Sequence, residues 1–281
     1  MSIMPFYDKL ECAWKKHNSV LCVGLDPNLD KLPERVKKET YPFFQFNKAI
    51  IDATYDLVCC YKPQIAFYSA IGGEIQLEMT IQYIKNTYPD IPVILDAKRG
   101  DIGSVAEMYA KEAFDRYKVD AVTVNPYMGT DTLEPYLQRQ NKGVVILCKT
   151  SNPGSRDLQE LQVHDQHIYE IIAHKAQHVW NTNRNILLVV GATYPTEMKS
   201  IRKIAPDITF LVPGVGAQGG NPEAVIKNGI DKNGYGIIIN SSRGIIYASN
   251  NDDYAEVART KAKFLKEEIN KYREKYINLC C

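Results

Sequence analysis

The chain has 281 residues, of which 45% are hydrophobic and 24% charged, and its 34 basic and 33 acidic residues leave a formal net charge of +1. That length is sufficient for a large buried core, and the near-zero charge gives no electrostatic reason to expect a nucleic acid or an anionic membrane as partner. The seven cysteines include no C-x-x-C pair, the N-terminus lacks an apolar signal segment, and no apolar run approaches the ~20 residues of a membrane span, so we expect a cytoplasmic protein with reduced thiols.

Eight short apolar runs, rich in β-branched residues, recur along the chain at residues 19–26, 57–64, 91–98, 120–126, 143–150, 185–193, 208–215 and 235–242. Continuous runs of this kind are typical of parallel strands that are covered on both faces. The amphipathic segments predict helices at 43–56, 74–88, 104–117, 132–140, 167–181, 195–204, 222–229 and 254–276, and a further helix is expected at 5–17.

Eight strand–helix units predict an α/β fold, a (β/α)8 TIM barrel with an extra N-terminal helix, in a single domain over residues 1–281. A doubly wound sheet is the alternative, but such a sheet usually has fewer strand–helix units in one domain of this size.

Six of the eight runs end in reactive or phosphate-binding residues. The first ends in Asp26, the second in Lys62, and the third in Asp96 and Lys98, while the fifth runs into Thr150 and Ser151. The last two run into the segments GVGAQGG and NSSRG. The carboxyl ends of the strands form the active-site face of a barrel, so we expect these residues to line one mouth.

The densest group of charges is LDAKRGDIG, residues 95–103. Asp96 and Lys98 are two apart on a strand and are therefore expected to point the same way, while Asp101 lies in the following loop and Lys62 reaches over from the neighbouring strand. Alternating charges hold one another ionised. A purely structural ion cluster is the alternative, but buried ion networks are rarely built for stability alone. Arg99, on the opposite side of the pleat, has no predicted catalytic role.

The segment PGVGAQGGNP contains a G-x-G-x-x-G pattern at Gly214, Gly216 and Gly219. It comes late in the chain and no acidic residue follows about 20 positions on, which argues against a dinucleotide site. A single-phosphate site built from the loops after the last two strands is favoured, with Gln218, Gly219 and Arg243 as ligands. Two glycine turns and a surface arginine are the alternative.

Two weaker signals remain. Thr150, Ser151 and Asn152 offer short donors and acceptors for the edge of a polar ring, although such turns are common. His174 and His178 have the i, i+4 spacing of a metal pair, but no third ligand is evident and a solvated helix face is favoured. No strand end has the Glu-plus-Asp pair expected of a Mg²⁺ site, so no metal or cofactor is implied.

These residues resemble a known family. LDAKRGDIG fits the D-x-K-x-x-D signature of the orotidine 5'-monophosphate decarboxylases, and PGVGAQGG and SSRGI are similar to that family's phosphate loops. VGLDPN and YKPQIAFY resemble its first two strands, and KTSNPG resembles its longer-chain subgroup, so the likeness covers roughly residues 21–247. A related family shares D-x-K-x-x-D but uses Mg²⁺, acts on sugar phosphates and lacks the glutamine in the phosphate loop.

The resemblance implies a cofactor-independent decarboxylation that yields uridine 5'-monophosphate, the last step of de novo pyrimidine synthesis. Lys98 would protonate C6 of the pyrimidine, and Asp96 would lie beside the departing carboxylate. The remaining roles would be ribose contacts and charge balance from Lys62, Asp101 and Asp26, pyrimidine contacts from Ser151 and Thr150, and phosphate contacts from Gln218, Gly219 and Arg243.

The resemblance also implies a homodimer, because in the family the residues that match Asp101 and Ile102 reach the other subunit's site. The sequence leaves open an association with an orotate phosphoribosyltransferase. Two other functions also stay open from the residues alone. One is a metal-dependent sugar-phosphate lyase or isomerase. The other is a protein that binds a phosphate ligand without turnover, although binding alone does not require a cluster of charges that is costly to bury.

Overall fold

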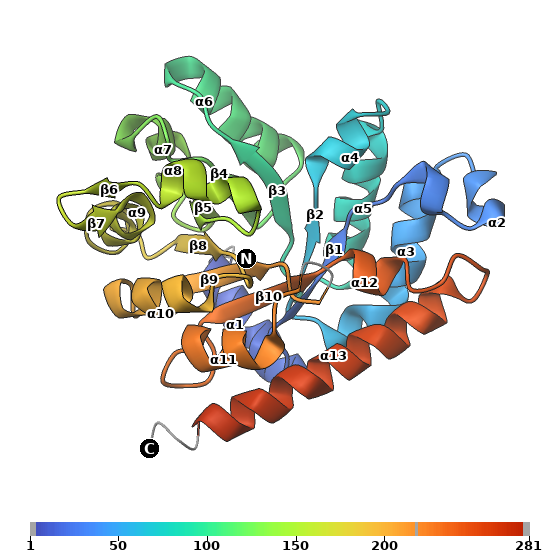
Figure 1. Cartoon of the computed structure of the whole chain (residues 1–281). Helices are drawn as coiled ribbons and strands as arrows, with labels where there is room; N and C mark the ends of the chain where they lie inside the picture. The colour runs from blue at the N-terminus through green and yellow to red at the C-terminus, as the bar shows by residue number, and fades with distance from the viewer. Residues whose placement is uncertain (1–3, 217–218, 278–281) are drawn as a thin grey trace.

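The computed structural model describes residues 4–216 and 219–277. Eight strands form one parallel sheet in the order β2-β1-β10-β9-β8-β5-β4-β3, and isolated bridges between Tyr61 and Val93 and between Gln64 and Asp96 bring its two edge strands together into a nearly closed barrel (Figure 1). The strands are β1 (Leu21–Leu25), β2 (Cys60–Pro63), β3 (Ile94–Arg99), β4 (Ala121–Val124), β5 (Gly143–Lys149), β8 (Ile186–Val190), β9 (Thr209–Pro213) and β10 (Ile237–Ser241). Each overlaps one of the eight apolar runs, so the predicted barrel is confirmed.

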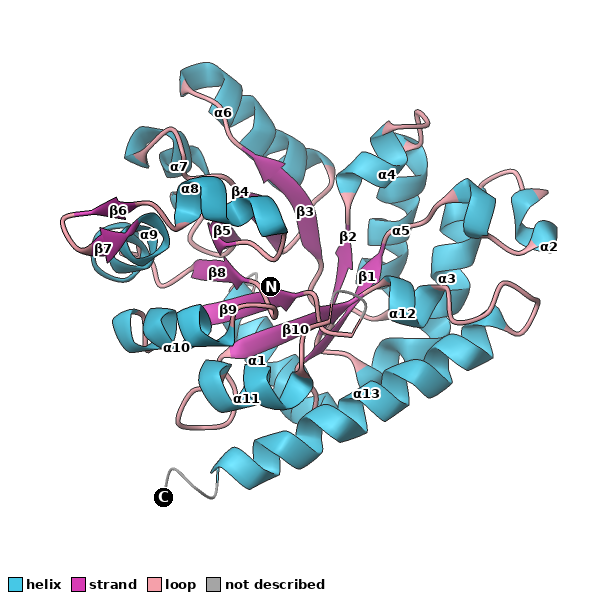
Figure 2. Ribbon diagram, in the orientation of Figure 1, coloured by secondary structure: helices cyan, strands magenta, loops and turns pink. Residues whose placement is uncertain are grey.

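Helices surround the strands, as Figure 2 shows. The longer ones are α1 (Phe6–His17), α3 (Pro42–Thr54), α5 (Glu74–Thr87), α6 (Gly103–Lys111), α7 (Thr130–Leu137), α9 (Ile168–Lys175), α10 (Pro195–Ile204), α11 (Pro222–Gly229) and α13 (Tyr254–Ile277). The short ones are α2 (Glu34–Lys37), α4 (Ile65–Ser69), α8 (Arg156–Gln159) and α12 (Arg243–Ile246). No helix within the described ranges is both long and apolar enough to cross a membrane.

The expected N-terminal helix is α1, which lies at the end of the barrel where the strands begin. Its apolar stripe, with Phe6, Leu10 and Trp14, is buried. Gly143 opens β5 under this helix, and a Cβ there would lie 2.7 Å from the Phe6 ring, so only glycine allows the close approach. With one end of the barrel covered in this way, the opposite end is left as the mouth.

The segment between β5 and β8 departs from a simple strand–helix unit. A 3-10 turn (Pro153–Ser155), α8 and a small antiparallel hairpin, β6 (Gln162–Val163) with β7 (Gln166–His167), precede α9. This stretch is short and polar, so it carries none of the apolar periodicity that predicts an element.

Candidate active site

The centre of the barrel mouth holds a three-residue charge cluster. Asp96, on β3, accepts hydrogen bonds from both predicted lysines: Nζ of Lys62 lies 2.9 Å from its Oδ2, and Nζ of Lys98 lies 2.7 Å from its Oδ1. Lys62 and Asp96 are buried, whereas the side chain of Lys98 is 45% exposed. The carboxylate is thus fixed from within the barrel, and one of its two ammonium partners faces the mouth.

The two buried members of this cluster stabilise each other's charges. Burial alone would raise the pKa of Asp96, but the nearby ammonium groups of Lys62 and Lys98 outweigh burial and hold that pKa well below its usual range. Burial alone would lower the pKa of Lys62, but attraction to Asp96 and then Asp26 raises it above its usual value. Both groups therefore stay ionised at neutral pH.

The backbone at Lys98 is unusual for a strand. Its φ is +48°, in the left-handed region, which costs a non-glycine residue about 1–2 kcal/mol. The pairing of β3 with β4 shifts register between Leu95 and Arg99. Asp96 and Lys98 therefore meet through this irregularity rather than through the plain alternation of a strand, which was the basis of their predicted proximity.

Thr123 on β4 was missed by the sequence analysis. Its hydroxyl donates to Oδ1 of Asp96 at 2.9 Å and accepts from the backbone N–H groups of Ala97 and Lys98, each at 2.9 Å. The available signal is a polar residue between Val122 and Val124, in the run next to the strand that carries the charges.

Asp101 lies outside this cluster. Its carboxylate accepts a hydrogen bond from the backbone N–H of Ile102 at 2.8 Å, and among the described residues no hydrogen bond or ion pair joins it to Lys62 or Lys98. Ile102 is 59% exposed. Arg99 makes a two-pronged ion pair with Glu112, which follows α6, and takes no part in the cluster.

Asp26 follows β1 at the same mouth. Its Oδ1 is buried and has no hydrogen-bond partner among the described residues. A buried carboxylate oxygen without a partner is costly. Asp26 is close enough to Lys62 to help raise the pKa of that lysine. The free Oδ1 is therefore suited to accept a hydrogen bond from a hydroxyl group of a bound molecule.

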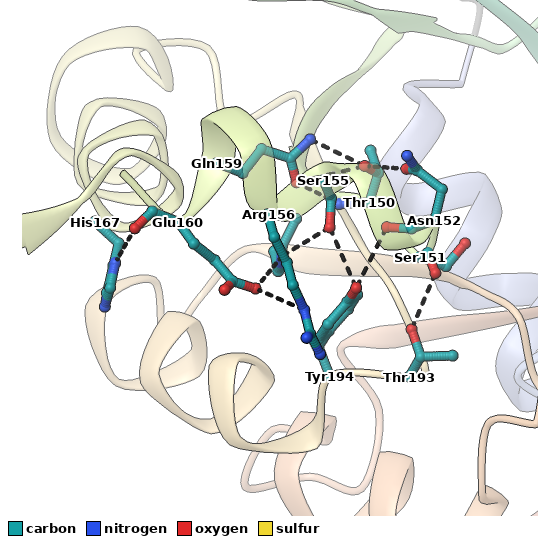
Figure 3. Close-up of polar contacts among 11 residues, drawn as sticks. Thr150, Ser151, Asn152, Ser155, Arg156, Gln159, Glu160, His167, Thr193 and Tyr194 are labelled. Carbon is teal, nitrogen blue, oxygen red and sulfur yellow. Dashed lines mark hydrogen bonds and ion pairs between the residues drawn. The ribbon is translucent and has the colours of Figure 1, made fainter. Parts of the chain in front are cut away.

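The predicted polar turn after β5 is held by contacts within its own loop and with Thr193 and Tyr194, which follow β8 (Figure 3). Thr150 donates to Oδ1 of Asn152 at 2.7 Å, and Gln159 of α8 contacts Thr150. Ser151 packs against the end of β8, where a Cβ on Gly191 would lie 2.7 Å from its Cα. The backbone carbonyl of Ser151 accepts from Thr193, and its hydroxyl makes no hydrogen bond with the described residues.

The base of this loop rests on a buried lysine that sequence reasoning also missed. Lys149, the last residue of β5, donates to Ser155 and to Glu160, each at 2.8 Å, and lies 4.0 Å from the centre of the Tyr194 ring. Burial of a lysine without partners would be expensive. These contacts therefore tie the loop of residues 150–160 to the barrel.

The predicted phosphate loop follows β9. Gly214, Gly216 and Gly219 all have positive φ values, which explains why glycine occupies these places. The N–H of Gly219 donates to the carbonyl of Gly216 at 2.9 Å, so it is used within the loop. Gln218 lies outside the described residues. Arg243 begins α12, is exposed, and makes no ion pair with the described residues.

Within residues 4–216 and 219–277, no group of three or more His, Cys, Asp or Glu side chains is placed to hold an ion. His174 and His178 do lie together, with ring centres 4.6 Å apart. A cavity of about 840 Å³ lies at the opposite end of the barrel against α1, and none of the predicted site residues lines it.

Comparison with known proteins adds a family to this geometry. Residues 19–258 match the model of the orotidine 5'-phosphate decarboxylase / HUMPS family. A curated orotidine 5'-phosphate decarboxylase from Cellvibrio japonicus is 55% identical over 95% of this chain and 98% of its own. The structure of Leishmania donovani OMP decarboxylase is 40% identical, with a TM-score of 0.84 over 96% of this chain and 99% of that one. Leishmania donovani UMP synthase is 42% identical with a TM-score of 0.86, and there this chain spans 57% of the relative.

Proposed function

Because the chain belongs to the orotidine 5'-phosphate decarboxylase family and catalyses the decarboxylation of orotidine 5'-monophosphate to uridine 5'-monophosphate, we propose that Lys98 is the proton donor of this reaction. The observation that carries the proposal is the Asp96–Lys98 contact of 2.7 Å at a mouth-facing, partly exposed ammonium group. Lys62 is held on the other carboxylate oxygen and is buried, so Lys98 is the member of the cluster that a bound substrate can meet.

The proposed step uses the substrate, the Lys98 ammonium group and a proton from solvent. The bond between C6 and the carboxylate breaks, carbon dioxide leaves, and the electron pair stays on C6 in the plane of the ring. A proton then moves from Nζ of Lys98 to C6, and the amine is reprotonated from solvent. A preorganised ammonium group beside the developing charge lowers the barrier before it gives up its proton.

Asp96 has a positioning role in this proposal. Its two oxygens accept from Lys62, Lys98 and Thr123, so the carboxylate has one orientation and Lys98 is held at one place. We also propose that Asp96 lies beside the departing carboxylate, where like charges would disfavour the bound ground state.

The substrate's other parts have proposed partners at the same mouth. The unpartnered Oδ1 of Asp26 suits a ribose hydroxyl, the hydroxyl of Ser151 suits the pyrimidine edge, and Arg243 suits the phosphate. Thr150, Gln218 and Gly219 complete the proposed set. The phosphate contacts supply binding energy remote from the reacting carbon.

We propose a homodimer in which Asp101 and Ile102 complete the neighbouring site. Among the described residues, no hydrogen bond or ion pair joins the carboxylate of Asp101 to its own chain's cluster. The loops after β3 and β4 lie together, since a Cβ on Gly100 would approach Met128 to 3.6 Å. Exposed apolar side chains gather on these loops and on α6, namely Ile102, Val105, Met108, Tyr127 and Met128. Exposed apolar side chains that gather on neighbouring loops and a helix support an interface at this place.

One assay tests this function against its two alternatives. Decay of the ultraviolet absorbance of orotidine 5'-monophosphate is followed with and without EDTA. We expect the same rate with and without EDTA, because every proposed step uses groups of the protein, the substrate and solvent rather than a metal ion. A rate that EDTA abolishes would favour a metal-dependent sugar-phosphate enzyme, and nucleotide binding without turnover would favour a binding protein.

A further inference from the structure

The strand that carries the charge cluster has an irregularity directly opposite Thr123. Leu95 of β3 pairs with Val122 of β4, and Arg99 pairs with Val124. Four steps along β3 therefore correspond to two steps along β4. The three residues 96–98 bulge out opposite the single residue Thr123, and a bulge leaves backbone groups without their usual partners on the next strand.

The hydroxyl of Thr123 takes the place of those partners. It accepts from the N–H groups of Ala97 and Lys98, each at 2.9 Å, and donates its own hydrogen to Oδ1 of Asp96 at 2.9 Å. A hydroxyl has one hydrogen to donate and two lone pairs to accept with. All three are used here, and the Thr123 side chain is fully enclosed.

The same hydroxyl therefore fixes two things at once. By holding the amide of Lys98, it keeps that residue in the left-handed conformation, with φ of +48°, that a lysine rarely adopts. By donating to Asp96, it orients the carboxylate oxygen on which Nζ of Lys98 rests, 2.7 Å away. The hydroxyl oxygen of Thr123 thus holds Lys98 in two ways. It binds the backbone N–H of the lysine directly, and it holds the ammonium group through Asp96.

We propose that Thr123 is a positioning residue for the decarboxylation, whose hydroxyl sets the place from which Lys98 delivers its proton. This inference rests on the proposed role of Lys98. Thr123 is enclosed behind the cluster, so it acts on the reaction through Asp96 and Lys98.

The test compares three substitutions at one position. Thr123→Ser keeps the hydroxyl, Thr123→Cys keeps a weak donor and acceptor, and Thr123→Val keeps the shape but has neither. Since a displacement of about 1 Å at a reacting group costs about 10²-fold in rate, we expect Thr123→Val to lower kcat by about that factor. Thr123→Ser should stay within a few-fold of wild type, and Thr123→Cys should fall between them.

The readouts that separate positioning from a general loss of structure are KM and product binding. The proposed ribose partner Asp26 follows β1 and the proposed phosphate partner Arg243 follows β10, so KM for orotidine 5'-monophosphate and Kd for uridine 5'-monophosphate should stay close to wild type in all three variants. Thr80→Val is the matched control. It removes a buried hydroxyl that bonds to the carbonyl of Gln76 in α5, outside the barrel, and should leave kcat unchanged.

The proposal is overturned if Thr123→Val keeps kcat near the wild-type value, or if kcat, KM and Kd deteriorate together in every variant. Should Thr123→Val fail to fold, Thr123→Cys decides: a kcat as high as that of Thr123→Ser, or a loss of kcat matched by equal losses in KM and Kd, would overturn the proposal. A Lys98→Ala enzyme that still turns over would overturn the proposed function instead, so the two failures are distinguishable.

Discussion

Nζ of Lys98 lies 2.7 Å from Oδ1 of Asp96, and the lysine side chain is 45% exposed while the aspartate side chain is 12% exposed. The pair therefore has an inner member that the barrel holds and an outer member that a ligand in the mouth can reach. Because of this difference, we expect replacement of Lys98 and replacement of Asp96 to have different effects.

Replacing Lys98 with alanine should remove activity and leave the fold intact. Asp96 keeps Lys62 as a partner, so no buried charge is stranded. Loss of the general acid and of its electrostatic effect should lower kcat by at least about 10³-fold. The absorbance assay and circular dichroism measure the two effects. Lys263→Ala, on an exposed face of α13, is the control and should behave as wild type; turnover by Lys98→Ala within tenfold of that control would contradict the proposed role.

Replacing Asp96 with asparagine should destabilise the protein at neutral pH, because it leaves buried Lys62 without its main counter-charge. Breaking a buried pair from one side costs about 3–5 kcal/mol, and the remaining attraction of Lys62 to the nearby charge of Asp26 places our expectation at about 3 kcal/mol. Urea unfolding at pH 7 measures the difference. Asp90→Asn is the control, since its pair with Lys16 is exposed at the surface and should contribute at most about 1 kcal/mol.

The stability contributed by Asp96 should also depend on pH in one direction. Its pKa is lower in the folded protein than in the unfolded chain, where it is about 4. The contribution is therefore fully present above about pH 4 and is lost as pH falls below that value towards the folded pKa. The gap in unfolding free energy between wild type and Asp96→Asn should narrow on acidification from pH 5 to about pH 3; a gap that widens would contradict the ionised state of Asp96.

Replacing Arg243 with alanine should act on substrate binding. A charge-assisted hydrogen bond contributes about 1.5–3 kcal/mol, so KM for orotidine 5'-monophosphate should rise by about 10- to 100-fold. The nucleoside orotidine has no phosphate and should react equally slowly with variant and wild type. Arg184→Ala, just before β8 at the far end of the barrel, is the matched control. An equal loss on both substrates would show that Arg243 does not contact the phosphate.

Mixing two inactive variants should restore activity if Asp101 serves the neighbouring subunit. In a mixed dimer of Lys98→Ala and Asp101→Ala chains, one site carries both defects and the other carries neither. Random exchange between equal amounts should therefore recover up to about a quarter of wild-type activity. Each variant refolded alone gives the baseline. No recovery, with mixed dimers demonstrated by size and mass, would place Asp101 in its own chain's site.

The barrel could be predicted from the sequence because its strands are buried on both faces, and eight continuous apolar runs leave little freedom in fold. The segment with α8 and the β6–β7 hairpin could not, because it is held by single polar contacts such as Lys149 with Glu160 rather than by an apolar stripe. Some helix ends also differ from the predicted ones. The predicted helix at 104–117 ends in a π-helical turn, Glu112–Arg116, which no residue pattern predicts.

The site, like the fold, has a part that could be predicted from the sequence and a part that could not. Residues at the ends of strands could be placed at one mouth, because topology alone puts them there. The contribution of Thr123 could not be predicted, because it depends on a register shift between β3 and β4 that the alternation rule for strands does not contain. The spacing of Asp96 and Asp101 likewise gives no sign of whether the second carboxylate turns inward or outward.

The pairing of β1 with β10 has a consequence for how the protein is made. Val23 lies beside Ser241, so the first strand acquires one of its two neighbours only when the ribosome has added more than 200 further residues. At about 5–20 residues per second, roughly 10–40 s pass between the synthesis of the two strands. Throughout that time the nascent chain presents an apolar edge able to pair with another chain. Completion of the barrel is therefore a late event, and a chaperone that shields this edge during translation should increase the yield of folded enzyme.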